Sequence, residues 1–413
     1  MTIDADHGWR EVQFGETYIR ALTQAGFVLP QGYGKGFPVL REPTLIALRV
    51  LREKFIEHVS DGSECVLARP SQLVPAWQYS EEVREFGGFD NCFEVQLDGR
   101  QFVLRPDAAL SNLRTLVARH ALGDKRPVVA VFQGFRKVDG ATAPLFRDRF
   151  IFPFVQFNRL VPMVRLDDAL NRLWRQLGDF FEALALPVRI VDFGSWKSYA
   201  RKLVVVVAHL PGGKPTIVAM CYVVGETYRQ QAGIPDDVAA LDVGITEKVL
   251  ATLAMKHRDQ TGIRLPSVVA PTQVVVSHEA RALGGEPLVR QLDGLRVVDA
   301  ANQRSRTVLA WSRRGAVLQL YRGRAGLRAF GRTRGWYNVG NAVAIRAELE
   351  AEDLCLLRAA SEDDWRNAFP RFAQQAESAS TATGRVVYIS RSLSEQAADI
   401  DITEEWYGPR VFY

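Results

Sequence analysis

The stretch FRKVDGATAPLFRDRFIF, residues 135–152, places three arginines around a short glycine-containing loop. The apolar run VVAVFQGF predicts a strand that ends at Arg136, and Arg147 and Arg149 open a second predicted strand. Antiparallel strands whose arginines converge at one loop suit a polyphosphate, because a guanidinium stays charged and can donate two hydrogen bonds to phosphate oxygens. An ordinary hairpin with surface arginines is the alternative interpretation.

The segments on either side predict the rest of the fold. Apolar residues at helical spacing predict helices over 44–60, 109–122 and 166–186. Apolar runs predict strands over 63–70, 100–106, 127–135, 146–157, 202–210 and 216–225. Because strands and helices do not alternate strictly, we expect an α+β fold with an antiparallel sheet of about six or seven strands flanked by helices.

Composition narrows the class of protein. The chain has 413 residues, of which 47% are apolar and 24% are charged, as in soluble proteins of more than one domain. No apolar run is long enough to cross a bilayer, and the polar N-terminal residues do not resemble a signal peptide, so we expect a cytoplasmic protein without a membrane partner. The four cysteines and six histidines are scattered, which predicts no metal site built from them.

Three further segments accompany the arginine hairpin in a fixed order. LRPDAAL (104–110) precedes it, and GITEKVL (244–250) and TGIRLPSVVAPTQVVV (261–276) follow it. In this order and spacing the segments resemble the catalytic core of a class II aminoacyl-tRNA synthetase, and most of all the prolyl-tRNA synthetase subgroup. An unrelated α+β protein is the alternative.

The resemblance implies a domain plan. A class II synthetase-like core would span residues 1–268, a smaller anticodon-binding-like α/β domain 269–350, and a C-terminal extension 351–413. The helix at 44–60 and the strand ending at Pro70 resemble the motif with which the family builds its dimer, so a homodimer is expected.

The resemblance also implies a reaction and its residues. The family activates an amino acid with ATP and Mg²⁺, and Arg136 and Arg147 match its catalytic phosphate-binding arginines. Arg149 lies beside them, Phe150 could pack on adenine, and Lys248 stands where the family has an adenine-stacking arginine. Lysine carries the charge but cannot stack as a flat guanidinium does.

The expected amino-acid pocket departs from the family. Asp107 stands where the family has a threonine, and it could bind a substrate ammonium or cap the helix that follows. Gly225 matches a family glycine, while Glu226 and Thr227 replace two amides. A family glutamate after the hairpin arginine is Val138 here. These changes make proline an unexpected substrate.

A basic stripe lies further along the chain. Residues 304–334 hold nine arginines and no acidic residue, with aromatic residues between them. Such a stripe can bind phosphates and stack on unpaired bases, which makes Arg313, Arg314, Arg322 and Arg324 candidate nucleic-acid contacts. A solvated basic face, or pairing with the acidic residues of the C-terminal extension, is the alternative.

Two functions stay open at this point. The chain could be an adenylate-forming ligase that activates an amino acid and transfers it to tRNA, a carrier protein or a small-molecule amine. It could instead be a catalytically inactive paralogue that serves as a regulatory or RNA-binding subunit. The arginines at positions 136 and 147 favour the ligase, and the changes at Val138 and Lys248 favour the paralogue.

Overall fold

The structure is a computed structural model of the whole chain. It describes residues 17–29, 36–77, 92–137, 143–146, 151–192, 200–211, 215–259, 261–277, 280, 282–283, 286–300, 308–323, 326–364, 383–389 and 405–407. The chain separates into two compact units. We call the unit formed by Arg52–Glu182, Pro187–Val249 and Asp364–Tyr413 the core unit, and the unit formed by Met1–Leu51, Ala183–Leu186 and Leu250–Asp363 the second unit.

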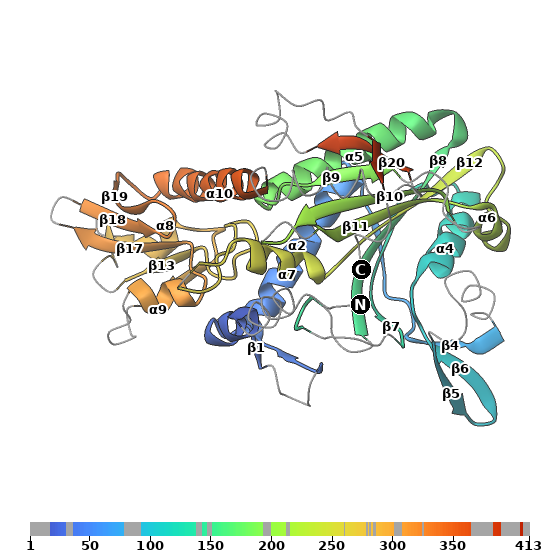
Figure 1. Cartoon of the computed structure of the whole chain (residues 1–413), viewed down its shortest axis with the longest axis horizontal. Helices are drawn as coiled ribbons and strands as arrows, with labels where there is room; N and C mark the ends of the chain where they lie inside the picture. Colours follow the sequence, from blue (N-terminus) through green and yellow to red (C-terminus); the bar gives the residue numbers. More distant parts are fainter. Residues whose placement is uncertain are drawn as a thin grey trace, which may run out of the picture. The chain divides into compact units, whose positions relative to one another are not determined.

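A nine-stranded sheet forms the centre of the core unit, with the strand order β21-β20-β9-β10-β11-β12-β8-β7-β3 (Figure 1). Its strands are β3 (Val66–Ala68), β7 (Val128–Phe135), β8 (Ile151–Pro162), β9 (Arg189–Asp192), β10 (Ala200–His209), β11 (Pro215–Val224), β12 (Val238–Thr246), β20 (Thr383–Ile389) and β21 (Glu405–Tyr407). All neighbours are antiparallel except β3 and β7, which run parallel. The predicted antiparallel α+β core is therefore confirmed.

The strand count exceeds the expected six or seven for a physical reason. β20 and β21 come from the C-terminal residues and extend the sheet beyond β9. β3 adds a short parallel strand at the other edge. Neither pairing has a local sequence signal, because strands far apart in the chain find each other only through the folded sheet.

Helices cover both faces of this sheet. α4 (Ala109–Ala121) and α6 (Glu226–Ala232) pack their apolar residues on one face, where Leu113, Leu116 and Tyr228 are buried. α5 (Leu166–Ala183) is strongly amphipathic and buries Phe180 and Phe181, with Phe180 edge-on to Phe55 of α2 (Glu42–Ser60). Strands β10 and β12 are buried along most of their length, which explains their continuous apolar sequences.

A small three-stranded sheet also belongs to the core unit. It has the order β4-β6-β5 and consists of β4 (Leu73–Pro75), β5 (Phe93–Leu97) and β6 (Arg100–Leu104). Asp98 and Gly99 turn between β5 and β6 with φ of 50° and 71°, as a tight Asp-Gly hairpin requires. This sheet ends next to Arg105, where the chain enters the loop before α4.

The second unit contains a mixed five-stranded sheet with the order β16-β13-β17-β18-β19. Its strands are β13 (Val274–Val276), β16 (Val297–Asp299), β17 (Leu318–Gly323), β18 (Gly326–Gly331) and β19 (Gly335–Val339). The β16–β13 and β13–β17 pairs are parallel and the other pairs are antiparallel. The structure thus has a smaller α/β sheet where the sequence predicts one, while the boundaries at residues 268 and 350 stay predictions.

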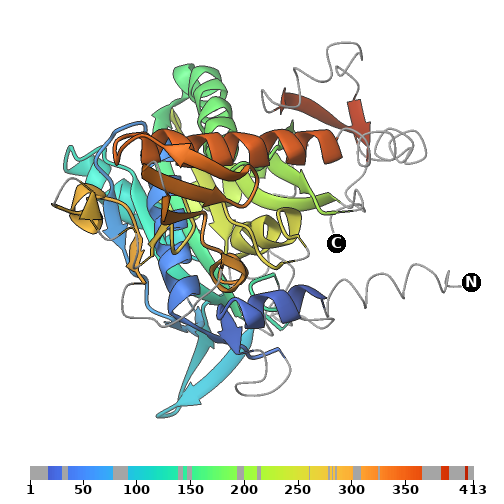
Figure 2. The same cartoon turned by 90° about the vertical axis from the view of Figure 1, so that its left-hand side faces the viewer.

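Helices lie on both faces of the smaller sheet. α9 (Val308–Arg313) is joined to one face by Gln319, whose Nε2 donates to Val308 O and Ser312 Oγ at 3.0 Å. α10 (Ala344–Asp363) lies on the opposite face, where Glu352 accepts the Thr333 and Arg334 backbone N–H groups (Figure 2). Further elements of this unit are β1 (Val28–Leu29), β2 (Val39–Leu40), β14 (Ala282–Leu283), β15 (Glu286–Pro287) and α8 (Leu288–Gln291).

Candidate active site

Arg136 follows directly after β7, at the point where the sequence predicts a phosphate-binding arginine. Its Nε donates to the carbonyl of Pro106 at 3.3 Å, and the neighbouring Phe135 N–H donates to the carbonyl of Arg105 at 2.8 Å. These bonds join the end of β7 to the loop that precedes α4. Two segments of the family resemblance, one around Arg136 and one around Asp107, therefore lie together.

Arg105 holds this loop in place. Its side chain is buried, and Nε donates to Ser71 O at 2.6 Å while Nη1 donates to Asp107 O and Ser111 Oγ. Such bonds from a charged donor are among the stronger ones available to a protein. The loop before α4 is therefore joined to Ser71 and Ser111 through the Arg105 side chain and to the end of β7 through Arg136.

Asp107 lies buried at the start of α4. Its Oδ1 accepts the N–H of Ala109, the first residue of α4, at 2.9 Å, while the N-cap position itself is Ala108. Burial raises the pKa of Asp107, and the positive charges of Arg136 and Arg105 act against that rise. The carboxyl therefore lies within electrostatic reach of Arg136.

A buried polar network lies on the same side of the sheet as α4. Gln156 Nε2 donates at 2.8 Å to both carboxyl oxygens of Asp242, and Asn112 Nδ2 donates to Asn158 Oδ1 at 2.8 Å. Asp242 pairs with Asn158 across β12 and β8. Burial raises the pKa of Asp242 to about 7, and the charge of Asp107 adds to the rise.

The sequence-based prediction missed these residues. Gln156 and Asn158 alternate with apolar residues in VQFNR, and Asp242 interrupts the apolar run AALDVGI. A polar side chain that recurs at every second position of an otherwise apolar strand is a signal that could have found them. The apolar pattern of the same segments predicts only that they are strands.

Lys248 opens α7 (Lys248–Lys256) just after β12. Its backbone N–H donates to Thr246 Oγ1 at 3.2 Å, and its Nζ lies 5.0 Å from the centre of the Phe146 ring. Phe146 thus has a cation over its face in the segment next to the predicted phosphate-binding arginines. Val138, Arg147, Arg149 and Phe150 lie outside the described residues.

Gly225, Glu226 and Thr227 lie elsewhere on the sheet. They follow the end of β11, where Val223 pairs with Leu241, whereas Lys248 follows the opposite end of β12. Gly225 has a φ of −78°, which any residue adopts, and Glu226 is exposed and pairs with Arg229 at 3.0 Å. The strand register instead places Tyr222 opposite Asp242 and Met220 opposite Gly244.

Two arginines of the basic stripe make ion pairs with other residues of the second unit. The side chain of Arg332 is 6% exposed, pairs with Asp259 and donates to the carbonyls of Gly262, Ile263 and Ser312. Arg334 pairs with Glu348. Arg332 and Arg334 thus make ion pairs within the second unit, and neither is among the four candidate nucleic-acid contacts predicted from the sequence.

The rest of the stripe is more accessible. Arg313 and Arg322 are exposed, and Arg314 is exposed and lies over the Trp311 ring at 5.4 Å. Arg324 lies outside the described residues. Arg328, which is not among the four candidate contacts chosen from the sequence, lies 4.9 Å from the ring centre of Trp336, which is 46% exposed.

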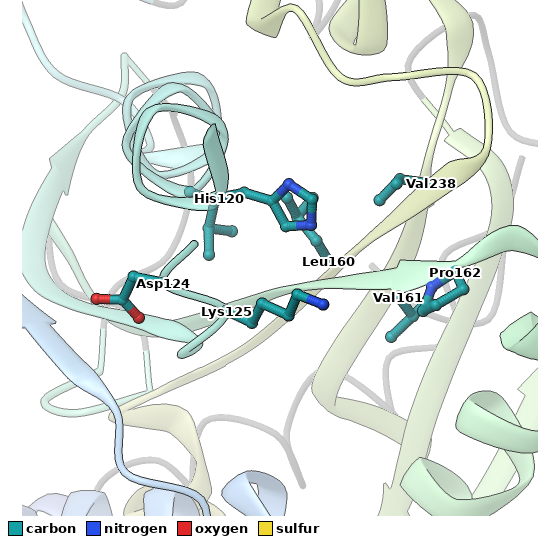
Figure 3. Close-up of a pocket in the computed structure, with 8 residues that line it drawn as sticks. His120, Asp124, Lys125, Leu160, Val161, Pro162 and Val238 are labelled. Atoms are coloured by element: carbon teal, nitrogen blue, oxygen red, sulfur yellow. The ribbon is translucent and has the colours of Figure 1, made fainter. Parts of the chain in front are cut away.

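A small cavity of about 70 Å³ lies at the far end of α4. His120, Asp124 and Lys125 line it on one side, and Leu160, Val161, Pro162 and Val238 line it on the other (Figure 3). No predicted site residue among those that the structure describes lines this cavity. Over the described part of the chain, no helix is long and apolar enough to span a membrane, and no group of three or more His, Cys, Asp and Glu could hold a metal ion.

Comparison with known proteins gives proline–tRNA ligases among the relatives. No protein-family model matches the chain. The proline–tRNA ligase of Methanococcoides burtonii is 26% identical over 225 residues, covering 49% of this chain and 47% of that protein. The proline–tRNA ligase of Methanoregula boonei is 25% identical over 326 residues, covering 70% and 65%. The chain spans about half the length of the first curated relatives it matches.

Solved structures share the fold. Prolyl-tRNA synthetase of Giardia lamblia in complex with prolyl-adenylate has a TM-score of 0.72 at 17% identity, covering 84% of this chain and 81% of that one. Prolyl-tRNA synthetase of Cryptosporidium parvum, complexed with halofuginone and AMPPNP, has a TM-score of 0.70 at 14% identity, covering 84% and 77%. The sequence relatives and the shared fold therefore confirm the predicted resemblance to prolyl-tRNA synthetases and their class II core.

Proposed function

We propose that the chain is an ATP-dependent amino-acid-activating ligase that forms an aminoacyl-adenylate. A carboxylate oxygen of the amino acid bonds to the α-phosphorus of ATP while the bond from that phosphorus to the bridging oxygen breaks, and pyrophosphate leaves. The step requires stabilisation of phosphate charge and alignment of two substrates more than it requires an acid or base.

The observation that carries this proposal is the meeting of Arg136 with the loop of Asp107. The guanidinium at the end of β7 would bind the α-phosphate and the substrate carboxylate, and Asp107 beside it offers a carboxyl to a substrate ammonium. Arg147 and Arg149 would bind the remaining phosphates, with Phe150 and Lys248 near the adenine. Mg²⁺ would accompany ATP, and we assign it no protein ligand.

Proline is not the expected substrate, since Asp107 and Asp242 place two buried carboxyl groups at the pocket and the apolar side chain of proline has no charge to pair with the second. The acceptor of the activated amino acid would be tRNA, a carrier protein or a small-molecule amine. The curated relatives, as proline–tRNA ligases, favour tRNA among these three.

The direct test is amino-acid-dependent exchange of labelled pyrophosphate into ATP, screened over a broad set of amino acids. Exchange with one or a few amino acids supports the ligase and names its substrate. Absence of exchange with every amino acid, from protein that is folded and binds ATP, contradicts it.

A second candidate is an RNA-binding subunit without catalysis. It is favoured by an aromatic cluster on the smaller sheet, where the ring centre of the partly exposed Trp336 lies 5.2 Å from that of Tyr321 and 5.3 Å from that of Phe330, with Arg328 over the Trp336 ring. Exposed aromatic rings beside arginines can stack on unpaired bases and neutralise phosphates.

This candidate is tested by filter binding of RNA at two salt concentrations. The wild type should lose affinity steeply as salt rises, because bound counterions are released from the RNA. Replacing Arg313, Arg314, Arg322 and Arg324 by Ser should flatten that dependence without a change in melting temperature. Weak binding that is the same for both proteins would argue against an RNA site here.

A further inference from the structure

Three polar side chains project from two central strands toward the same face of the core sheet. Gln156 and Asn158 are two residues apart on β8, and Asp242 on β12 lies opposite Asn158, so all three share one face. They are 8%, 0% and 6% exposed. Polar groups this deep in a sheet cost stability unless they are fully hydrogen-bonded or serve a ligand.

The hydrogen bonding of Gln156 is incomplete. Its Nε2 donates to both oxygens of Asp242, while its Oε1 is buried and has no partner among the described residues. Turning the amide over would exchange the two atoms and leave the nitrogen without a partner instead. In either orientation one polar atom of the Gln156 amide, next to Asp242, has no hydrogen-bond partner among the described residues.

Next to Gln156 and Asp242 the sheet carries a glycine, which has no side chain to fill the space above the strand. Gly244 pairs with Gln156 on one side and with Met220 on the other, on the face that carries Asp242. A methyl group added to Gly244 would lie within 4 Å of one described atom only, the carbonyl oxygen of Val155 at 3.6 Å. Space for a small group therefore adjoins both Gln156 and Asp242.

The Asp242 carboxyl has no positive charge among the groups that act on it. Gln156, Asn158 and the like charge of Asp107 act on the Asp242 carboxyl, and no cation is among these groups. Asp107 differs, since Arg136 and Arg105 both act on it. A ligand cation at Asp242 would supply the missing positive charge and complete the hydrogen bonds of Gln156.

We propose that Asp242 and Gln156 bind an ammonium group in the side chain of the substrate, so that the activated amino acid is a diamino acid with a short basic side chain. This inference rests on the proposed function for the orientation of the substrate. With the α-carboxylate on Arg136 and the α-ammonium on Asp107, the side chain extends along the sheet to Asp242. Tyr222, opposite Asp242 on β11, would close the recess on its other side.

The test is calorimetric binding of amino acids to the full chain in the presence of a non-hydrolysable ATP analogue. The panel contains 2,3-diaminopropionate, 2,4-diaminobutyrate, ornithine and lysine. Amino acids of the same chain length with an uncharged side chain are the counterparts, such as 2-aminobutyrate for 2,3-diaminopropionate and norvaline for 2,4-diaminobutyrate, and proline is included as a further comparison. Wild type is compared with Asp242→Asn and Gln156→Met. Asp236→Asn is the control, because Asp236 is a fully exposed acid of the same unit.

We expect one of the diamino acids to bind at least tenfold more tightly than its uncharged counterpart. Asp242→Asn should weaken that binding by about a hundredfold, as for loss of one partner of a buried ion pair. Gln156→Met should weaken it less, and the control should not change it. Equal binding of charged and uncharged amino acids, no binding of any, or binding unaffected by Asp242→Asn would overturn the inference.

Failure of this inference and failure of the proposed function have different signatures. Pyrophosphate exchange with an uncharged amino acid, unchanged in Asp242→Asn, would leave the ligase standing and remove the diamino acid. Binding of a diamino acid that depends on Asp242, without exchange, would remove the ligase and keep the site. A melting curve for each variant shows that the comparison is made between folded proteins.

Discussion

Asp242→Asn should make the protein more stable at pH 8 while it damages the proposed site. The pKa of Asp242 is raised from 3.8 to about 7, chiefly by burial. The folded protein therefore keeps a proton on this carboxyl that the unfolded chain loses above pH 4. Stability should fall as the pH rises from about 4 to about 7, and should level off once the folded form also loses its proton.

The magnitude follows from the size of the shift. A rise of roughly three pKa units at 1.36 kcal/mol each corresponds to a penalty on the order of 4 kcal/mol above pH 7. Asparagine has nearly the same shape, can still accept a hydrogen bond from Gln156, and carries no charge at any of these pH values. The variant should thus equal the wild type near pH 4 and exceed it by about 2–4 kcal/mol at pH 8.

Urea unfolding followed by tryptophan fluorescence between pH 4 and pH 8.5 measures this difference. Asp236→Asn removes an exposed acid and should follow the wild-type profile. Asp107→Asn should lower the pKa of Asp242, because the charge of Asp107 contributes to the rise, and should make the fall in stability with pH smaller. Parallel profiles for wild type and Asp242→Asn across this range would refute the assignment of a buried, protonated carboxyl.

Particular contacts support three more predictions. Arg136→Ala should reduce pyrophosphate exchange by two to three decades, because one charge-assisted contact in a desolvated site contributes about 2–4 kcal/mol; Arg175→Ala, an exposed arginine of α5, is the control, and unchanged turnover in Arg136→Ala would remove that residue from the site. Arg332→Ala should lower the free energy of unfolding by about 2–3 kcal/mol, since it removes the cation paired with Asp259 and the donor to the carbonyls of Gly262, Ile263 and Ser312. The exposed Arg322→Ala should cost under about 0.5 kcal/mol in the same denaturation assay. The chain should be a homodimer by light scattering at micromolar concentration, since α2 and β3 correspond to the predicted dimer motif and Leu67 of β3 is 73% exposed; a monomer would contradict this.

Much of the core could be predicted from local pattern. The apolar runs at 128–135 and 202–210 and the amphipathic run at 166–186 became β7, β10 and α5 with ends shifted by a few residues. Arg136 falls where the strand pattern stops, and its place just after β7 needed no tertiary information. The apolar run at 386–390 also predicts a strand, which overlaps β20, but the pairing of β20 and β21 with the core sheet could not be predicted. Pairing at a sheet edge depends on which edge the folded core leaves open.

The residues of the candidate site fall into the same two groups, those predicted from local sequence and those that depend on contacts between distant segments. Order and spacing along the chain predict which residues stand at the family's motif positions, and on that basis Arg136, Asp107 and Lys248 are proposed as site residues from the sequence. The folded structure is needed to show that Gln156 hydrogen-bonds Asp242, that Arg332 pairs with Asp259, and that Glu226 is exposed to solvent. These outcomes depend on strand register and burial, and a shift of one residue in register turns every side chain to the other face.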